Sequence, residues 1–344
     1  MAEDVNILIT GSAGFMGSHL VDGLLNKGFK NVYGLDDLSG GYMDNVNPKS
    51  HFTILDLRKR EKLEQYIEKV KPQIIFHLAA DATEGRSQFT PISCTERNYL
   101  AYLNLLVPAI KHGVEKIILT SSMSVYGSQK PPFTEDMFRL PDDIYGISKS
   151  AMERATEILS KVHGFKYVII RPHNVYGPGQ NLSDPYRNVI AIFINCLLNN
   201  RNFYIYGDGE QKRAFSYIDD FTPYIIKAAF IKEAEGKIFN IGPVQEVTIN
   251  ELADIVLKTF FPAGIPSKLI PKHLPPRPLE VKEAWCTVDK AKRILGYKTT
   301  LTLADGVRRM IAWARKKGPQ EFHYLDDLEI VNKYTPVTWV EKLL

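Results

Sequence analysis

The 344-residue chain has few cysteines, little net charge and no long apolar run. Its three cysteines, Cys94, Cys196 and Cys286, are too few and too widely spaced for a disulfide framework or a zinc site. We therefore expect no metal centre and a reducing, cytoplasmic compartment. With 43 Lys and Arg against 39 Asp and Glu, the net charge of +4 argues against a dedicated nucleic-acid binder. No segment approaches the roughly 20 apolar residues of a membrane span, so we expect no membrane association.

The first half of the chain alternates short apolar runs with helically spaced apolar residues. The pattern predicts strands at 5–10, 31–35, 52–55, 73–79, 116–121 and 167–171, and helices at 16–25, 59–70, 98–112 and 145–163. Continuous β-branched runs between helices are typical of strands buried on both faces. The sequence therefore predicts an α/β fold with a Rossmann-type, doubly wound parallel sheet.

Beyond residue 171 the texture of the sequence changes, because glycines and prolines become frequent. A short strand at 203–206 and helices at 250–261 and 305–316 are expected, with a proline-rich loop at 266–278. We predict an NAD-binding domain over 1–171 and a smaller, mixed α/β substrate-binding portion over 172–344. Some segments of the second portion are expected to return to the first sheet, and 319–344 receives no assignment.

A glycine-rich turn joins the first predicted strand to the first predicted helix. Gly11 would make the tight turn, Gly14 would admit a pyrophosphate, and Gly17 would let the helix pack close to the strand. The first N–H groups of a helix attract phosphate. The spacing G-x-x-G-x-x-G alone also fits a merely flexible turn.

An acidic pair follows the second predicted strand. Asp36 lies nineteen residues after Gly17, where a carboxylate accepts hydrogen bonds from an adenosine ribose and repels a 2′-phosphate. No Arg or Lys is adjacent to Asp36 in sequence, which favours NAD over NADP. The structural alternative is that Asp36 serves a turn or a helix cap.

A tyrosine and a lysine lie one helical turn apart at Tyr145 and Lys149. A lysine at this spacing can lower the pKa of a tyrosine hydroxyl and make it a general base. Upstream, Ser122 and Ser124 follow the fifth predicted strand, at the strand end that faces ligands in such sheets. The alternatives are an exposed Tyr/Lys pair and a serine-rich turn.

Together, in this order, these motifs resemble the extended short-chain dehydrogenase/reductase superfamily of nucleotide-sugar enzymes. The resemblance covers roughly residues 5–317. It also includes four further segments: His77-Leu-Ala79-Ala80 with Asn98, Arg171-Pro-His-Asn174, Tyr206 to Asp220 around Arg213, and Arg277-Pro-Leu-Glu280. It implies an NAD-dependent enzyme acting on a nucleotide-diphosphate sugar.

The resemblance implies a role for each matching residue. Tyr145 would be the base, Lys149 its partner, and Ser122 would assist at the reacting oxygen. Two larger sets would bind ligands. The cofactor set is Gly11, Gly14, Phe15, Met16, Gly17, Asp36, Asp37, Asp56, Leu57, Leu78, Ala79, Ala80 and Asn98 with Tyr145 and Lys149; the substrate set is Ser122, Ser124, Asn174, Arg213 and Arg277. Two arginines suit a diphosphate, because a guanidinium binds phosphate with two donors.

The residues after Ser122 decide between the reactions of this superfamily. The 4,6-dehydratases place an Asp-Glu pair at the positions of Met123 and Ser124, and UDP-glucuronate decarboxylases resemble this region but carry Glu at 124. Chemistry that needs only NAD and one base remains, which is epimerisation at C4. A decarboxylase, a keto-sugar reductase and a non-catalytic NAD-binding regulator are the alternatives.

The resemblance leaves the sugar open. Where hexose-restricted epimerases often carry a tyrosine, the match here is Ala284, and after the His77 segment the match to a frequent lysine is Ala82, near Glu84. A small residue at 284 would admit an N-acetylhexosamine or a uronate as well as a hexose. UDP is the favoured nucleotide, and a homodimer through 98–112 and 145–163 is expected.

Overall fold

A seven-stranded parallel sheet forms the centre of the protein. The structure, a computed structural model, describes residues 5–325 and 328–344. In sheet order the strands are β11 (Lys237–Ile241), β6 (Lys166–Pro172), β5 (Lys116–Thr120), β4 (Ile74–His77), β1 (Ile7–Thr10), β2 (Val32–Asp36) and β3 (His51–Ile54). The order reverses between β1 and β4, where ligands bind in doubly wound sheets. The predicted Rossmann-type α/β fold is confirmed.

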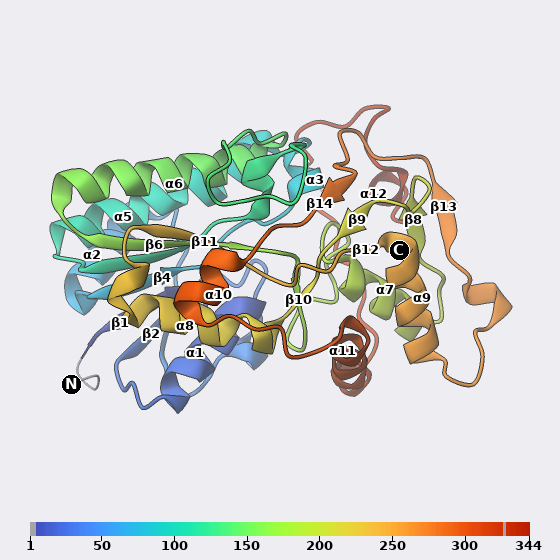
Figure 1. The fold of residues 1–344 in the computed structure, drawn as a ribbon, viewed down its shortest axis with the longest axis horizontal. Coiled ribbons are helices and arrows are strands. Elements are labelled where there is room, and N and C mark those ends of the chain that lie inside the picture. Colours follow the sequence, from blue (N-terminus) through green and yellow to red (C-terminus); the bar gives the residue numbers. More distant parts are fainter. Residues whose placement is uncertain (1–4, 326–327) are drawn as a thin grey trace.

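Helices cover both faces of this sheet (Figure 1). On one face lie α2 (Arg60–Val70), α5 (Ala101–Lys111) and α6 (Ile144–His163), and on the other lie α1 (Phe15–Asn26), α8 (Thr222–Phe230) and α10 (Asp289–Leu295). Alternate strand residues enter separate apolar clusters: Ile7 and Ile9 pack toward α1, whereas Leu8 packs toward α2 and α5. Burial on both faces explains why the strands read as continuous apolar runs.

The structure also differs from the predicted elements. Strand β11 was not predicted, yet it pairs in parallel with β6 and so carries a C-terminal segment back into the sheet. The segment 98–112 is not one regular helix: α4 (Pro91–Thr95) runs through a π-helical turn, Glu96–Leu100, into α5. The prediction placed that helix's start too late because the π-turn disturbs the 3.6-residue spacing.

The C-terminal part builds small sheets and helices beside the strand ends. Strand β8 (Tyr204–Tyr206) pairs with β13 (Lys272–Leu274), β9 (Lys212–Arg213) pairs with β12 (Val247–Thr248) and β14 (Glu283–Ala284), and β7 (Val175–Tyr176) pairs with β10 (Ser216–Tyr217). The helices are α7 (Val189–Leu198), α9 (Ile249–Phe260) and α11 (Leu303–Lys317). The prediction of a plain loop at 266–278 was wrong, because β13 and a short 3-10 helix, Ser267–Leu269, lie within it.

The tail after α11 folds back over the strand ends and includes α12 (Val337–Val340). Trp339 packs against Phe89 and Tyr186, with ring centroids 5.8 and 5.1 Å away. Leu344 joins the same apolar cluster as β1 and α1. Within residues 5–325 and 328–344, no helix is long and apolar enough to cross a bilayer.

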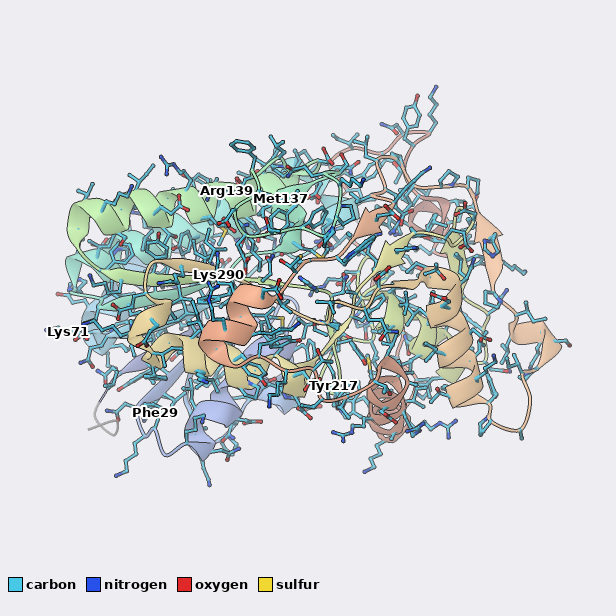
Figure 2. All side chains as sticks on the ribbon, in the orientation of Figure 1. Phe29, Lys71, Met137, Arg139, Tyr217 and Lys290 are labelled. Carbon is cyan, nitrogen blue, oxygen red and sulfur yellow. The ribbon has the colours of Figure 1, made fainter. Side chains whose placement is uncertain are left out.

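A buried ion-pair network fastens α6 to β6. The Arg171 guanidinium, 1% exposed, donates to both carboxylate oxygens of Glu153 at 2.8 and 2.6 Å and to the Tyr126 hydroxyl at 2.8 Å. Arg139 lies along α6, as Figure 2 shows, and contacts Glu153 and Glu157 at 3.1 Å. The motif residue Arg171 therefore stabilises the helix that carries Tyr145 and Lys149.

Candidate active site

A cavity of about 830 Å³ opens at the carboxyl ends of the sheet strands. This volume lies in the upper range for ligand sites and has room for a dinucleotide together with a second ligand. Among the predicted site residues, those that line it are Gly11, Gly14, Phe15, Met16, Gly17, Asp36, Asp37, Asp56, Leu57, Leu78, Ala79, Ala80, Ser122, Ser124, Tyr145, Lys149, Asn174, Arg213 and Arg277. The fold thus collects residues from most of the chain at one place.

The glycine turn leaves space that side chains would fill. Gly11 has φ +71°, and a Cβ there would lie 2.8 Å from the backbone nitrogen of Ala79. A Cβ on Gly17 would overlap the Gly11 carbonyl. Helix α1 begins after Gly14 without a side-chain cap, so its first N–H groups are available to an anion. This cradle fits the diphosphate of a dinucleotide.

Asp36 holds this cradle in place. One carboxylate oxygen accepts a hydrogen bond from the Ala13 N–H at 3.0 Å, and the other accepts one from the Leu38 N–H at 2.8 Å. Burial raises the pKa of Asp36, while these N–H donors oppose that change. Asp36 therefore serves the turn, as the structural alternative held, and also lines the cavity, where a ribose hydroxyl could donate to its remaining lone pairs.

Two arginines lie at the same end of the cavity, although none is adjacent to Asp36 in sequence. Arg58 donates to Asp56 from Nε and Nη2, at 2.8 Å for the shorter contact, and Arg97 lies 3.8 Å from the Asp37 carboxylate. Each arginine is thus paired with an acid. Arg58 and Arg97 are distant from Asp36 in sequence, so the sequence did not reveal that they are nearby. The carboxylates of Asp56 and Asp37 offset their positive charge.

The structure does not bring Asn98 to the cavity. Its side chain is fully buried in the π-turn, accepts from the Asp81 N–H at 3.1 Å, and donates to the carbonyls of Asp81 and Cys94. Its side chain does not line the cavity, so its contact with the cofactor remains a prediction. Asn98 instead fastens the segment after Ala80, which does line the cavity.

Tyr145 and Lys149 lie in the first turns of α6, in the middle of the cavity. Asp143 caps the helix by accepting the Gly146 N–H at 2.7 Å, and the Ser87 hydroxyl accepts the Tyr145 N–H at 3.2 Å. The Lys149 ammonium lies 5.7 Å from the centre of the Tyr145 ring and donates to the Thr120 carbonyl at 2.8 Å. The two side chains therefore lie close together, as the spacing predicts.

The electrostatics of this pair differ from the expectation that Lys149 lowers the pKa of Tyr145. Burial raises the pKa of Tyr145 well above its usual value, Glu84 and Asp143 raise it further, and a hydrogen bond with Ser122 opposes them. Burial lowers the pKa of Lys149 to about 8. In the protein alone, loss of water thus outweighs the lysine charge.

A row of hydroxyls and a carboxylate lies beside Tyr145. The Ser122 hydroxyl donates to the Ser124 hydroxyl at 3.1 Å, and Ser124 donates to the Glu84 carboxylate at 3.1 Å. Glu84 is the first residue of α3 (Glu84–Ser87). A carboxylate therefore reaches the neighbourhood of Ser124 from another element, although neither Met123 nor Ser124 is acidic.

The far end of the cavity holds two guanidinium groups near each other. Arg213 donates to the carbonyls of Lys212, Val281 and Lys282, and Arg277 lies over the Tyr206 ring at 4.9 Å. Burial lowers the pKa of Arg213, and the charge of Arg277 lowers it further. An anion between them would relieve this repulsion, which suits a diphosphate.

Asn174 and Ala284 also line the end of the cavity that holds Arg213 and Arg277. Asn174 lines the cavity with its amide donating to the Ala214 carbonyl at 2.9 Å. Ala284 lines the cavity too, packed with Met123 and Phe133, so a larger side chain at 284 would narrow the sugar end.

Sequence reasoning missed several residues of the cavity. Asp143 lies two residues before Tyr145, and burial together with Glu84 raises its pKa to about 7. Arg187 pairs with Asp184 at 2.8 Å and lines the cavity near Tyr145. From the tail, Thr338 and Trp339 also line it. The position of Asp143 at the start of a predicted helix could have identified it as a capping residue. No local feature of the tail sequence indicated that the tail lies beside the cavity.

Comparisons with known proteins agree with this geometry. Residues 7–242 match the model of the NAD dependent epimerase/dehydratase family. A putative UDP-glucose 4-epimerase of Methanocaldococcus jannaschii is 33% identical, over 90% of this chain and 98% of that protein. Two solved structures are similar: a UDP-glucose 4-epimerase from Thermotoga maritima with UDP-glucose (TM-score 0.85, 32% identity, 91% of this chain and 99% of that one) and one from Thermus thermophilus with NAD (0.82, 30%, 90% and 98%). The chain belongs to the NAD-dependent epimerase/dehydratase family.

Proposed function

We propose that the protein epimerises a nucleotide-diphosphate sugar at C4, with UDP as the favoured nucleotide. The observation that carries this proposal is that Tyr145, Lys149 and Ser122 line the same cavity as the glycine cradle, Arg213 and Arg277. The substrates named for the similar proteins, UDP-glucose among them, support the same reaction class.

NAD fits the cradle end of the cavity. Backbone N–H groups at Gly14 to Gly17 would hold its diphosphate and Asp36 its ribose, while the remaining cofactor residues flank it: Asp56, Leu57, Leu78, Ala79 and Ala80. When bound, NAD supplies a hydride acceptor and donor and places a positively charged ring beside Tyr145.

Tyr145 is the proposed base and acid. In its phenolate form Tyr145 takes the proton of the C4 hydroxyl, and as a phenol it later returns that proton to the epimer, so no net proton is lost. Ser122 holds the reacting oxygen through its hydroxyl. Lys149, buried beside the Tyr145 ring, is the cation that the chain itself supplies against the carboxylates nearby.

The diphosphate anchor explains how one base can serve both epimers. Arg213, Arg277 and Asn174 would hold the nucleotide diphosphate while the sugar turns over within the cavity. Ala284 leaves room for that rotation and for an N-acetyl group.

The function is tested by incubating the purified protein, without added cofactor, with UDP-glucose, UDP-N-acetylglucosamine, UDP-glucuronate, a GDP-hexose and a CDP-hexose. Proton NMR should show the anomeric signal of a C4 epimer without accumulation of NADH. Tyr145→Phe should abolish turnover and retain NAD binding. An accumulating keto sugar, loss of carbon dioxide or turnover by Tyr145→Phe would contradict the proposal.

A second candidate is elimination across C5 and C6, as in a dehydratase. The observation that favours it is the pair of acids near Tyr145: the pKa of Asp143 is raised to about 7 by burial and by Glu84. After oxidation at C4, such a pair could remove a proton from C5 and protonate the leaving C6 hydroxyl; the hydride taken from C4 would then be added at C6, and a proton would return to C5. A 4-keto-6-deoxy sugar in the same NMR experiment would identify this reaction.

The proposed assembly is a homodimer, and the proposed compartment is the cytoplasm. Ile147, Ile158 and Val162 on α6 are 50, 45 and 69% exposed, which supports an interface on that helix, whereas Leu106 and Met152 are core residues. Three free, buried thiols suit a reducing compartment. Analytical ultracentrifugation should give twice the chain mass.

A further inference from the structure

Helix α3 places a carboxylate at the sugar end of the cavity, beside the residues proposed to act at C4. Glu84 is exposed to the cavity and accepts the hydrogen bond of Ser124 at 3.1 Å. Ser124 in turn accepts from Ser122 at 3.1 Å. The two serines thus connect Glu84 to the position where the reacting oxygen would lie.

Among the described residues, neither Glu84 nor Asp143 has an ion-pair partner, whereas three other acids nearby do. Asp81 pairs with Arg86 at 2.5 Å, Asp184 with Arg187 at 2.8 Å, and Glu280 with Arg277 at 2.6 Å. Across 5–325 and 328–344, no Lys, Arg or His nitrogen lies within 4.0 Å of the Glu84 carboxylate. Glu84 therefore makes no direct ion pair, although the charges of Lys149, Arg213 and Arg277 act on it from farther away.

The charge of Glu84 acts where the sugar must bind. After burial, Glu84 is the strongest influence raising the pKa of Tyr145, and it also follows burial in raising the pKa of Asp143. Arg187 opposes the effect on Tyr145 but is the weakest of the influences, and it is paired with Asp184. An anion bound between Tyr145 and Glu84 would therefore be repelled by the Glu84 carboxylate.

We propose that Glu84 is a specificity residue that selects neutral nucleotide sugars and excludes uronates. The proposal rests on the proposed C4 chemistry, because that chemistry places C4 at Tyr145. The carboxylate of a uronate is attached at C5, next to C4, so it would lie within a few ångströms of Tyr145 and Glu84. Two carboxylates that lie this close together repel each other.

A neutral sugar would be attracted to Glu84 rather than repelled by it. Its hydroxyls, or the N–H of an N-acetyl group, can donate to Glu84, and a hydrogen bond to a charged acceptor is stronger than one between neutral groups. Ala284 leaves space for the larger substituent. Of the three sugar classes left open by the sequence, the structure thus favours UDP-hexoses and UDP-N-acetylhexosamines.

The test compares UDP-glucuronate with UDP-glucose in the wild type, Glu84→Gln and a control, Glu68→Gln. Glu68 lies exposed on α2, outside the cavity, so its substitution removes the same charge elsewhere. Affinities are measured by calorimetry with NAD present, and kcat/KM by NMR. In Glu84→Gln, the preference for UDP-glucose over UDP-glucuronate should fall by about tenfold or more, and in Glu68→Gln it should not change.

The two measurements separate the failure of this proposal from that of the function. If neither sugar is epimerised, the C4 function fails, while the two affinities still test Glu84. If the wild type binds UDP-glucuronate as well as UDP-glucose, or if Glu84→Gln leaves the preference unchanged, Glu84 does not select the sugar. NAD affinity equal to that of the wild type shows that each variant is folded.

Discussion

At the scale of single residues, Tyr145 lies in surroundings that disfavour its charged form. Burial, Glu84 and Asp143 all raise its pKa, and the Lys149 ammonium lies 5.7 Å from the centre of its ring. A Y-x-x-x-K spacing predicts that Tyr145 and Lys149 lie close together. It does not predict the direction in which the Tyr145 pKa shifts, since the acids that raise it come from α3 and from the turn before α6. The positive charge of the nicotinamide ring of a bound NAD would oppose this rise in the Tyr145 pKa.

Asp143→Asn should shift the pH dependence of kcat/KM to lower pH. Asparagine keeps the helix cap but removes the charge that Asp143 acquires above its pKa of about 7, so Tyr145 should lose its proton more readily. We expect the rising limb to move down by about 0.5 to 1 pH unit. Asp142→Asn, at the exposed neighbour, should leave the profile in place, and an upward shift in Asp143→Asn would contradict this account.

Asp143 also affects how the stability of the protein depends on pH. The folded pKa of Asp143 lies above its ordinary value of 3.8, so the folded state binds this proton more tightly than the unfolded chain. Its stabilising contribution is complete below about pH 4 and is lost as the pH rises toward 7. Urea unfolding at pH 5 and at pH 8 should therefore show a smaller pH difference in Asp143→Asn than in the wild type.

At the scale of elements, the turn from β1 to α1 depends on glycine for close approach. Gly11→Ala should weaken NAD binding by about tenfold or more, because the Cβ would meet the Ala79 backbone and close the cradle. Fluorescence titration with NAD measures the effect. Gly28→Ala is the matched control: its φ of +89° imposes similar strain, but nothing lies within 4 Å of a Cβ there. Equal loss in both variants would assign the effect to strain alone.

The buried ion pair between Glu153 and Arg171 connects α6 to β6. Glu153→Gln should lower the free energy of unfolding by about 3 to 5 kcal/mol, because the Arg171 charge would remain buried without its partner. Glu157→Gln, which removes a more accessible partner of Arg139, should cost about 1 kcal/mol or less. Urea unfolding measures both, and equal losses would contradict the role of the buried pair.

Elements with strong local patterns were predictable, and elements formed by distant pairing were not. The spacing in α6 and the apolar runs of β1 and β5 gave boundaries close to those observed. Strand β11 is set by its pairing with β6, about seventy residues earlier, and β13 by its pairing with β8. Asn98 matched a motif, but its contacts depend on a π-turn that no periodicity reveals.

At the scale of the whole molecule, the tail closes the substrate end of the cavity. The Thr338 hydroxyl hydrogen-bonds that of Tyr206 at 2.5 Å, and Tyr206 supports Arg277 through its ring. Trp339 packs on Phe89 and Tyr186 beside α3. The tail thus supports the proposed diphosphate site and also lines the cavity near α3. It could not be placed from sequence because all of these contacts join distant segments.

Trp339→Ala should raise KM for the nucleotide sugar by about tenfold, since a buried aromatic side chain would be lost from the cavity wall. NAD affinity should stay at the wild-type value, because the cradle lies at the other end. Val340→Ala, at the exposed adjacent position, controls for the tail itself. A loss of NAD affinity equal to that of substrate would show that Trp339 serves general stability instead.

In the proposed reaction, hydrogen leaves C4 of the sugar and returns to the same carbon without exchange with water. Epimerisation of UDP-glucose in D₂O, followed by proton NMR, tests it most directly. The account predicts a C4 epimer that retains its C4 hydrogen and gains no deuterium at C5 or C6. Deuterium at C5 or C6 would instead indicate elimination, and deuterium at C4 would contradict hydride transfer.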